Sequence, residues 1–139
     1  ESRGGLNIIH PWFQTLAFHP AWFGRVVMPG GRFVGGVSFV GDGCEPFAPV
    51  ENTFVLVDRG NCSFALKARH TRLAGGNVLL VSNTYNQFFT MTDDGSAGRL
   101  GQLFAGLIRR KDGELLKSNS NIQLSLGFDF LHRPHWLEL

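Results

Sequence analysis

The sequence has no long hydrophobic run. Its longest apolar stretches, Val78–Val81 and Leu103–Ile108, are far shorter than the roughly 20 residues that a membrane-spanning helix needs. No signal-peptide pattern follows Glu1. We therefore expect no direct membrane insertion by this segment. If the protein is secreted or anchored, its targeting segment or anchor lies outside these residues.

A strong excess of one charge is also missing. The 139 residues include 13 Lys and Arg against 11 Asp and Glu, and the basic residues are scattered apart from Arg109-Arg110-Lys111. This pattern argues against nucleic-acid binding, which uses a concentrated basic surface. The length, with no repeat or interdomain linker, predicts a single domain over residues 1–139.

Cysteine is scarce. Cys44 and Cys62 are the two cysteines of the chain, and they are compatible with one disulfide or with two unrelated thiols. A bridge between them would stabilise the fold by about 3 kcal/mol in the chain-entropy model. Asn61-Cys62-Ser63 matches the N-glycosylation pattern, so Asn61 is a candidate glycan site on a short motif with many false positives.

Residue combinations typical of enzymes and metal sites are missing as well. His132 and His135 are separated by a proline that precludes a regular helical pair, and no acid or cysteine lies beside them. Ser63 and Cys62 have only His70 nearby, about two helical turns away, and no Gly-x-Ser-x-Gly motif occurs. We therefore predict no enzyme activity, no cofactor and no bound metal.

The middle of the chain predicts a βαβ unit. Thr53–Asp58 is a nearly continuous apolar run, typical of a strand buried on both faces. A helix should follow, with Ser63 as its N-cap and Gly75-Gly76 beyond its end. Val78–Val81 is the second buried strand, so the two strands should be parallel with a right-handed crossover. The predicted buried helix face holds Phe64, Ala68 and Thr71, with Lys67, Arg69 and Arg72 largely outside it.

The N-terminal third is rich in aromatic and turn residues. Ile8-Ile9 is a possible short strand. Val26–Met28 and Arg32–Val34 flank Pro29–Gly31 in a hairpin-like arrangement, and the second strand can extend through Val40.

The C-terminal part adds three further elements. Leu103–Ile108 is typical of a strand, Lys111–Gly113 predicts a turn into a short helix over Glu114–Ser118, and Ile122–Phe130 alternates as a half-buried strand does. Ser82–Gly101 is a long polar loop. Together the patterns predict a β-rich α+β domain: a distorted sheet or open β-barrel or sandwich, flanked by short helices.

The end of the first βαβ strand is the candidate binding site. Asp58, Arg59 and Gly60 lie where that strand ends and the helix is about to begin. In sheets with parallel strands, ligands tend to sit beyond the carboxyl ends of the strands. A guanidinium there can hold a peptide carbonyl or carboxylate through two parallel hydrogen bonds, which Lys cannot do.

These residues carry a family resemblance. The run Thr53-Phe-Val-Leu-Val-Asp-Arg-Gly-Asn-Cys-Ser-Phe-Ala-Leu-Lys-Ala68, followed by Ala74-Gly75-Gly76 and Val78-Leu-Leu-Val-Ser-Asn83, closely resembles the core of the protease-associated (PA) domain. The likeness spans most of residues 23–130. Within the family it is most similar to the luminal PA domain of vacuolar sorting receptors.

The resemblance implies a non-catalytic module that binds a peptide or protein, such as sorting-signal cargo. It implies a Cys44–Cys62 disulfide and a location in the secretory-pathway lumen, vacuolar or endosomal, or outside the cell. One alternative is an accessory domain that regulates or positions an attached protease, ER mannosidase or ubiquitin ligase. Another is that the protein is itself a small secreted PA glycoprotein. The candidate ligand-binding residues are Arg32, Asp58, Arg59, Gly60, Thr90, Met91, Asp93 and Asp94.

Overall fold

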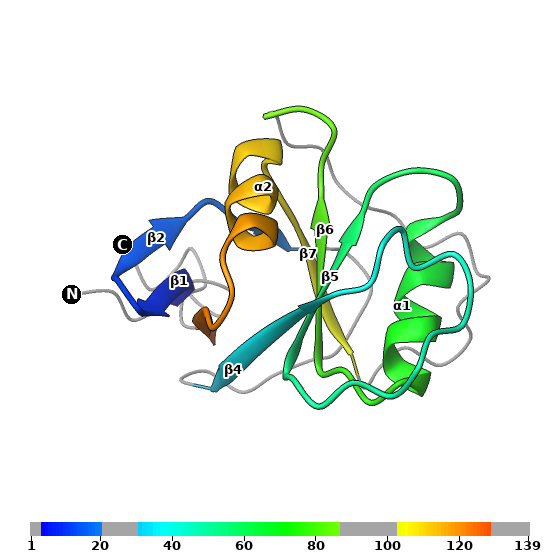
Figure 1. The fold of residues 1–139 in the computed structure, drawn as a ribbon, viewed down its shortest axis with the longest axis horizontal. Helices are drawn as coiled ribbons and strands as arrows, with labels where there is room; N and C mark the ends of the chain where they lie inside the picture. The colour runs from blue at the N-terminus through cyan, green and yellow to red at the C-terminus, as the bar shows by residue number, and fades with distance from the viewer. Residues whose placement is uncertain (1–3, 21–30, 87–102, 129–139) are drawn as a thin grey trace, which may run out of the picture.

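The computed structural model describes residues 4–20, 31–86 and 103–128 of the chain (Figure 1). In chain order its elements are β1 (Gly4–His10), β2 (Gln14–Leu16), β3 (His19–Pro20), β4 (Arg32–Phe39), β5 (Phe54–Asp58), α1 (Phe64–Leu73), β6 (Val78–Ser82), β7 (Phe104–Ile108), α2 (Arg110–Ser118) and β8 (Gln123–Phe128).

The eight described strands form one curled sheet in the order β2-β1-β8-β4-β5-β6-β7-β3. Strands β4, β5, β6 and β7 run parallel, whereas β1, β2, β3 and β8 pair antiparallel with their neighbours. Leu6 of β1 and Leu80 of β6 share one core although three strands, β8, β4 and β5, lie between them in the sheet, in keeping with the curl. The predicted β-rich α+β class, with an open and distorted sheet flanked by short helices, is confirmed.

Successive side chains of the parallel strands point to opposite faces of the sheet and pack into a separate hydrophobic core on each face. Phe54, Leu56 and Leu80 pack on the face that α2 covers, together with apolar residues of β1 and β8. Val55 and Val57 pack on the other face against α1. Figure 1 shows α1 and α2 on opposite sides of β5 to β7. The continuous apolar runs of these strands therefore reflect burial on both faces.

Helix α1 forms where the βαβ pattern predicts it, and β5 and β6 are parallel as expected. Ser63 is its N-cap, and the Ser63 side chain accepts a hydrogen bond from the Leu66 N–H at 3.1 Å. The predicted exposure of Lys67 is wrong. Lys67 is fully buried, because its ammonium group has main-chain carbonyl partners beneath the helix.

Helix α2 begins at Arg110, four residues before the predicted start, so the predicted turn at Lys111–Gly113 is wrong. The buried Asp112 carboxylate accepts from Nε of Arg109 at 3.2 Å and thereby holds the first turn. Gly113 lies at the point where α2 meets Ser82 of β6. A Cβ on Gly113 would come within 2.6 Å of the Ser82 Cβ, so this glycine permits close packing.

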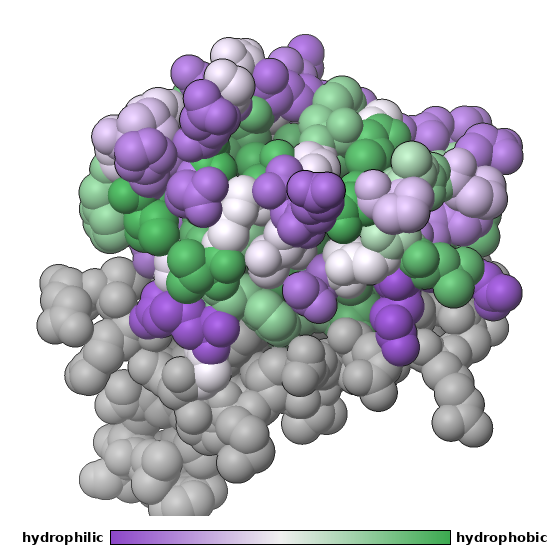
Figure 2. Space-filling model, turned by 60° about the horizontal axis from the view of Figure 1, so that its bottom comes forward, coloured by the Kyte–Doolittle hydropathy of each residue, from purple (hydrophilic) through white to green (hydrophobic). Residues whose placement is uncertain are grey.

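Other predicted strands are longer in the structure or partly undescribed. The short strand at Ile8-Ile9 is part of β1, and β4 spans eight residues. Several predicted features lie outside the described residues. They are the strand Val26–Met28, the turn residues Pro29 and Gly30, most of the long polar loop (residues 87–102) and residues 129–139. On the face shown in Figure 2, hydrophobic residues form several separate patches with hydrophilic residues between them.

Candidate functional site

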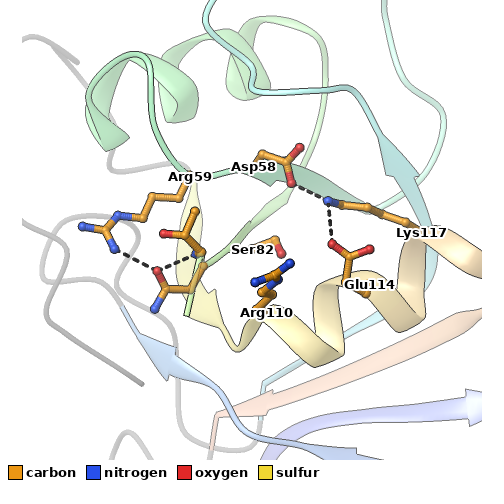
Figure 3. Close-up of a pocket in the computed structure, with 8 residues that line it drawn as sticks. Asp58, Arg59, Ser82, Arg110, Glu114 and Lys117 are labelled. Atoms are coloured by element: carbon orange, nitrogen blue, oxygen red, sulfur yellow. Dashed lines mark hydrogen bonds and ion pairs between the residues drawn. The ribbon is translucent and has the colours of Figure 1, made fainter. Parts of the chain in front are cut away.

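A pocket of about 430 Å³ opens at the carboxyl ends of β5 and β6, alongside helix α2 (Figure 3). Its walls are formed by Asp58, Arg59, Ser82, Asn83, Thr84, Arg110, Glu114 and Lys117. The structure therefore brings Asp58 and Arg59 together at one concave site, as their position after a buried strand predicts. The pocket lies along α2, whereas the sequence pointed to the start of α1.

Arg59 is held in a defined orientation. Its backbone N–H donates to the Ser82 carbonyl at 3.0 Å, and Nη1 donates to Oδ1 of the buried Asn83 at 2.9 Å. The same Oδ1 also accepts from the Thr84 N–H at 2.8 Å. The contact with the Asn83 amide oxygen therefore orients the guanidinium of Arg59. Sequence reasoning gave Asn83 no role beyond its place in the motif.

The opposite wall carries a charged cluster that sequence reasoning missed. Nζ of Lys117 forms an ion pair with Asp58 and lies 3.8 Å from Oε2 of Glu114. It also lies 4.9 Å from the centroid of the exposed Phe39 ring, within cation–π range. The helical i, i+4, i+7 spacing of Arg110, Glu114 and Lys117 was the available signal. It was hidden because the helix was expected to begin at Glu114.

The turn that follows β5 is held in place by a disulfide and by hydrogen bonds from Lys67. Cys44 and Cys62 form a disulfide, which confirms the pairing implied by the resemblance. Nζ of Lys67 donates to the Gly60 and Asp42 carbonyls at 2.7 Å each. Gly60 itself is exposed with φ of 108°, a conformation that favours glycine, so it shapes the turn after Arg59.

Asn61 lies in the same turn and is exposed with φ of 73°. Its Nδ2 donates to Oδ2 of Asp42 at 3.0 Å. The Cys44 N–H and the Asn61 amide hold the pKa of the Asp42 carboxyl below its usual range, with a further contribution from the charge of Lys67. Glycosylation of Asn61 stays a prediction.

The remaining predicted ligand-binding residues are not in this pocket. Arg32 begins β4, and the register of β4 with β5 places it roughly 30 Å from Asp58 along the strand direction. Its Nη1 donates to Oγ of Ser125. The loop residues Thr90, Met91, Asp93 and Asp94 lie outside the described part of the chain.

The residues weighed as a nucleophile and a base have other partners. Cys62 is in the disulfide, and Oγ of Ser63 caps α1. Nδ1 of His70 lies 2.9 Å from the Gly43 carbonyl. Within the described ranges, no three His, Cys, Asp or Glu side chains are grouped as metal ligands would be. His132 and His135 fall outside those ranges.

No helix among the described residues is long and apolar enough to cross a membrane.

The chain is similar to known proteins of two kinds. It is 28% identical to vacuolar-sorting receptor 5 of Arabidopsis thaliana over 152 aligned residues, which cover 98% of this chain and 24% of the receptor. The chain thus spans about a quarter of the length of that relative.

Among solved structures, an aminopeptidase from Aneurinibacillus sp. strain AM-1 matches with a TM-score of 0.62 and 18% identity, over 86% of this chain and 28% of that chain. BSAP, a zinc aminopeptidase from Bacillus subtilis, matches with a TM-score of 0.64 and 16% identity, over 87% of this chain and 29% of that chain. At these identities the likeness shows the fold.

The family model of the PA domain matches residues 23–116. That range includes the βαβ unit, both cysteines and every residue that lines the pocket except Lys117. The curled sheet and the disulfide agree with this match, and the resemblance seen in the sequence is confirmed. The chain therefore belongs to the PA domain family.

Proposed function

We propose that this PA domain is a non-catalytic recognition module that binds an extended peptide or protein segment in the pocket beside Arg59. The observation that carries the proposal is that Arg59, whose guanidinium is oriented by Asn83, is one of the residues that line a pocket of about 430 Å³. A pocket of this size accommodates a few side chains of a peptide. The predicted loop residues Thr90, Met91, Asp93 and Asp94 are proposed to contribute from the segment that follows Asn86.

Two further observations support a role in protein sorting or recognition. The similarity to a vacuolar-sorting receptor extends over 98% of this chain. The Cys44–Cys62 disulfide suits an oxidising compartment. It supports our proposal that the domain works in the secretory-pathway lumen, in vacuolar or endosomal compartments, or outside the cell.

The contacts of the candidate catalytic residues support a function without chemistry. A nucleophile needs a base within hydrogen-bond reach. Cys62 has no thiol in this state, and the Ser63 hydroxyl accepts from the Leu66 N–H, while His70 faces the Gly43 carbonyl. We therefore infer that the domain binds its ligand without changing it.

The test is the variant Arg59→Ala, with Arg72→Ala as the matched control. Arg72 is an exposed arginine in the last turn of α1 and does not line the pocket. Binding of an immobilised random decapeptide library would be measured for both variants and the wild type. We expect Arg59→Ala to weaken retention about tenfold, because a charge-assisted hydrogen bond is lost. Arg72→Ala should bind as the wild type does.

Thermal unfolding separates a binding role from a structural one. Asn83 keeps the Thr84 N–H as a donor when the guanidinium is removed, so the loss of the Arg59–Asn83 hydrogen bond should cost less than about 1 kcal/mol of stability. A parallel loss of retention and of stability would assign Arg59 a structural role and contradict the proposal.

A second candidate function comes from the solved structures. The matched region makes up 28% and 29% of the two aminopeptidase chains, so this fold occurs as a part of larger peptidase chains. In this alternative the domain regulates or positions an attached protease, ER mannosidase or ubiquitin ligase. The domain alone would then retain no peptide, and its deletion from the full-length protein would change the activity of the attached part.

A further inference from the structure

One stripe of α2 forms a wall of the pocket. Arg110, Glu114 and Lys117 are spaced at i, i+4 and i+7, so they project from the same side of the helix. Figure 3 shows them facing the strand ends that carry Asp58 and Ser82. From Arg110 to Lys117 the stripe spans eight residues, roughly 10 Å along the helix axis.

The two basic residues of this stripe differ in whether they have an acidic partner. Lys117 is shared by two carboxylates, those of Asp58 and Glu114, and is therefore satisfied within the domain. Arg110 is exposed, and its side chain forms no hydrogen bond or ion pair with residues 4–20, 31–86 or 103–128. The Arg110 end of the pocket thus presents a cation to solvent.

Fold stability does not explain a cation at Arg110. It is the first residue of α2, where the helix dipole disfavours positive charge. The preceding Arg109 is compensated by the buried carboxylate of Asp112, but Arg110 has no such partner among the described residues. An arginine that the helix itself disfavours, on the wall of a pocket, is the position expected for a ligand contact.

Main-chain donors around the pocket are already used. The N–H groups of Arg59, Asn83, Thr84, Arg110 and Lys111 all donate to acceptors within the domain. A terminal carboxylate is usually captured by a cradle of such N–H groups, and these five are not available for one. An anionic ligand group would therefore meet side chains, as an acidic residue within a peptide can.

From these observations, and resting on the proposed function, we propose that the pocket selects peptides with an internal Asp or Glu, whose carboxylate pairs with Arg110. The planar guanidinium can bind that carboxylate through two parallel hydrogen bonds. Asp58 and Glu114 at the other end of the pocket disfavour a second acid there. The selectivity is thus for a local acidic residue and not for overall negative charge.

The test uses four immobilised pools of N-acetylated decapeptides. Three pools are C-amidated and carry Glu, Gln or Lys at the central position, with uncharged residues elsewhere; the fourth carries Gln and a free C-terminal carboxylate. The wild-type domain should retain the Glu pool about tenfold more than the Gln or free-carboxylate pools, and the Lys pool least. Arg110→Glu should reverse the order of the Glu and Lys pools.

Lys111→Glu is the matched control. It makes the same change in charge at the neighbouring helix position, which is exposed and does not line the pocket. This variant should keep the wild-type order. The melting temperature of Arg110→Glu should stay close to that of the wild type, because the gain from an acid in the first turn of α2 is opposed by repulsion from Glu114 at i+4. Altered selectivity in a protein as stable as the wild type cannot come from misfolding.

Equal retention of the Glu, Gln and Lys pools would overturn the inference. So would equal effects of Lys111→Glu and Arg110→Glu, or retention of the free-carboxylate pool as strongly as the Glu pool. If Arg59→Ala weakens binding of every pool while Arg110→Glu leaves the order unchanged, this inference fails and the proposed function stands. If the wild type retains no pool, both fail.

Discussion

Among single residues, Lys67 has the most unusual environment for its chemistry. Its ammonium group is fully buried and donates to the Asp42 and Gly60 carbonyls, beside the sulfur of Cys44. Removal from water lowers the pKa of Lys67 from its ordinary value of 10.5, and the charges of Asp42 and Asp58 partly oppose this shift. The side chain therefore joins the turn before Cys44 to the turn after Arg59.

Replacing Lys67 with Met keeps the length of the side chain and removes both hydrogen bonds. We expect Lys67→Met to lower the free energy of unfolding by about 2 kcal/mol near neutral pH, since hydrogen bonds from a charged donor are lost. Urea unfolding measures this difference. Arg69→Met on the exposed side of α1 is the control and should change stability little.

The difference between the two proteins should also depend on pH. Because the folded-state pKa of Lys67 is lowered, the unfolded chain binds more protons between that pKa and 10.5, so wild-type stability rises with pH in this window. Lys67→Met lacks the titrating group and should not show this rise. Parallel stability curves for the two proteins up to pH 10.5 would contradict the assignment.

Single residues also show where sequence reasoning stops. Arg59 was predicted at the site because its position after a buried strand is a local property. Lys67 was placed on the exposed side of the helix, since its carbonyl partners lie 25 and 7 residues away and cannot be inferred from helical periodicity. Asn83 was missed as the partner of Arg59 for the same reason.

Among the elements, the contact between α2 and β6 determines the width of the pocket. Gly113 faces Ser82, and a Cβ at Gly113 would be 2.6 Å from the Ser82 Cβ and closer still to its Oγ. Neither Cβ can rotate away, because both are fixed by the backbone. The lack of a side chain at Gly113 therefore allows α2 to lie close to the strand ends.

The variant Gly113→Ala tests this contact. Alanine favours the helix by about 1 kcal/mol, but overpacking costs about 1–3 kcal/mol, and we expect a net loss of stability together with weaker peptide binding. Chemical denaturation of Gly113→Ala, Ser82→Gly and the double variant completes a double-mutant cycle. The double variant should be more stable than the sum of the single changes predicts; strict additivity would show that the two residues do not meet.

The two helices were predicted with different success for a physical reason. The start of α1 carries a capping serine and its end carries glycines, so its bounds are encoded locally. The start of α2 has no side-chain cap of its own, and its first N–H groups bond to the Tyr85 carbonyl and the Asn86 side chain. Its N-terminus thus depends on a distant segment, and Gly113 looked like a turn residue.

For the whole molecule, the two cores share the same strands. Phe54 and Val55 are neighbours in β5, yet one packs on the α2 side and the other on the α1 side. If these strands separated, the apolar side chains of both cores would be exposed to water. The described part of the chain should therefore unfold as one cooperative unit.

Two fluorescence reporters test this prediction. Trp12 packs against the core on the α2 side, and Phe64 packs against the core on the α1 side. One protein would keep Trp12 as its sole tryptophan, and another would carry Phe64→Trp as the sole tryptophan. Their urea midpoints should differ only by the amount that calorimetry assigns to the substitutions. A separate early transition from the Phe64→Trp reporter would show that the two layers unfold independently.

The overall class could be predicted because strands, turns and the βαβ unit are visible in local patterns. The order of the strands could not. Strand β8 lies between β1 and β4, and Leu6 pairs with Leu126, a partner far away in sequence. Local periodicity does not report such pairings, so the position of α2 over the sheet, and with it three of the eight residues that line the pocket, was also beyond prediction.

The position of β8 also has a consequence for synthesis on the ribosome. β1 and β4 leave the exit tunnel long before β8, the strand that joins them, and β8 is the last strand that the structure describes. Until it emerges, the nascent chain can close β5 and β6 around α1 but must leave the edges of β1 and β4 without this partner. Such edges invite association with other chains, so chaperones have a defined interval in which to shield them.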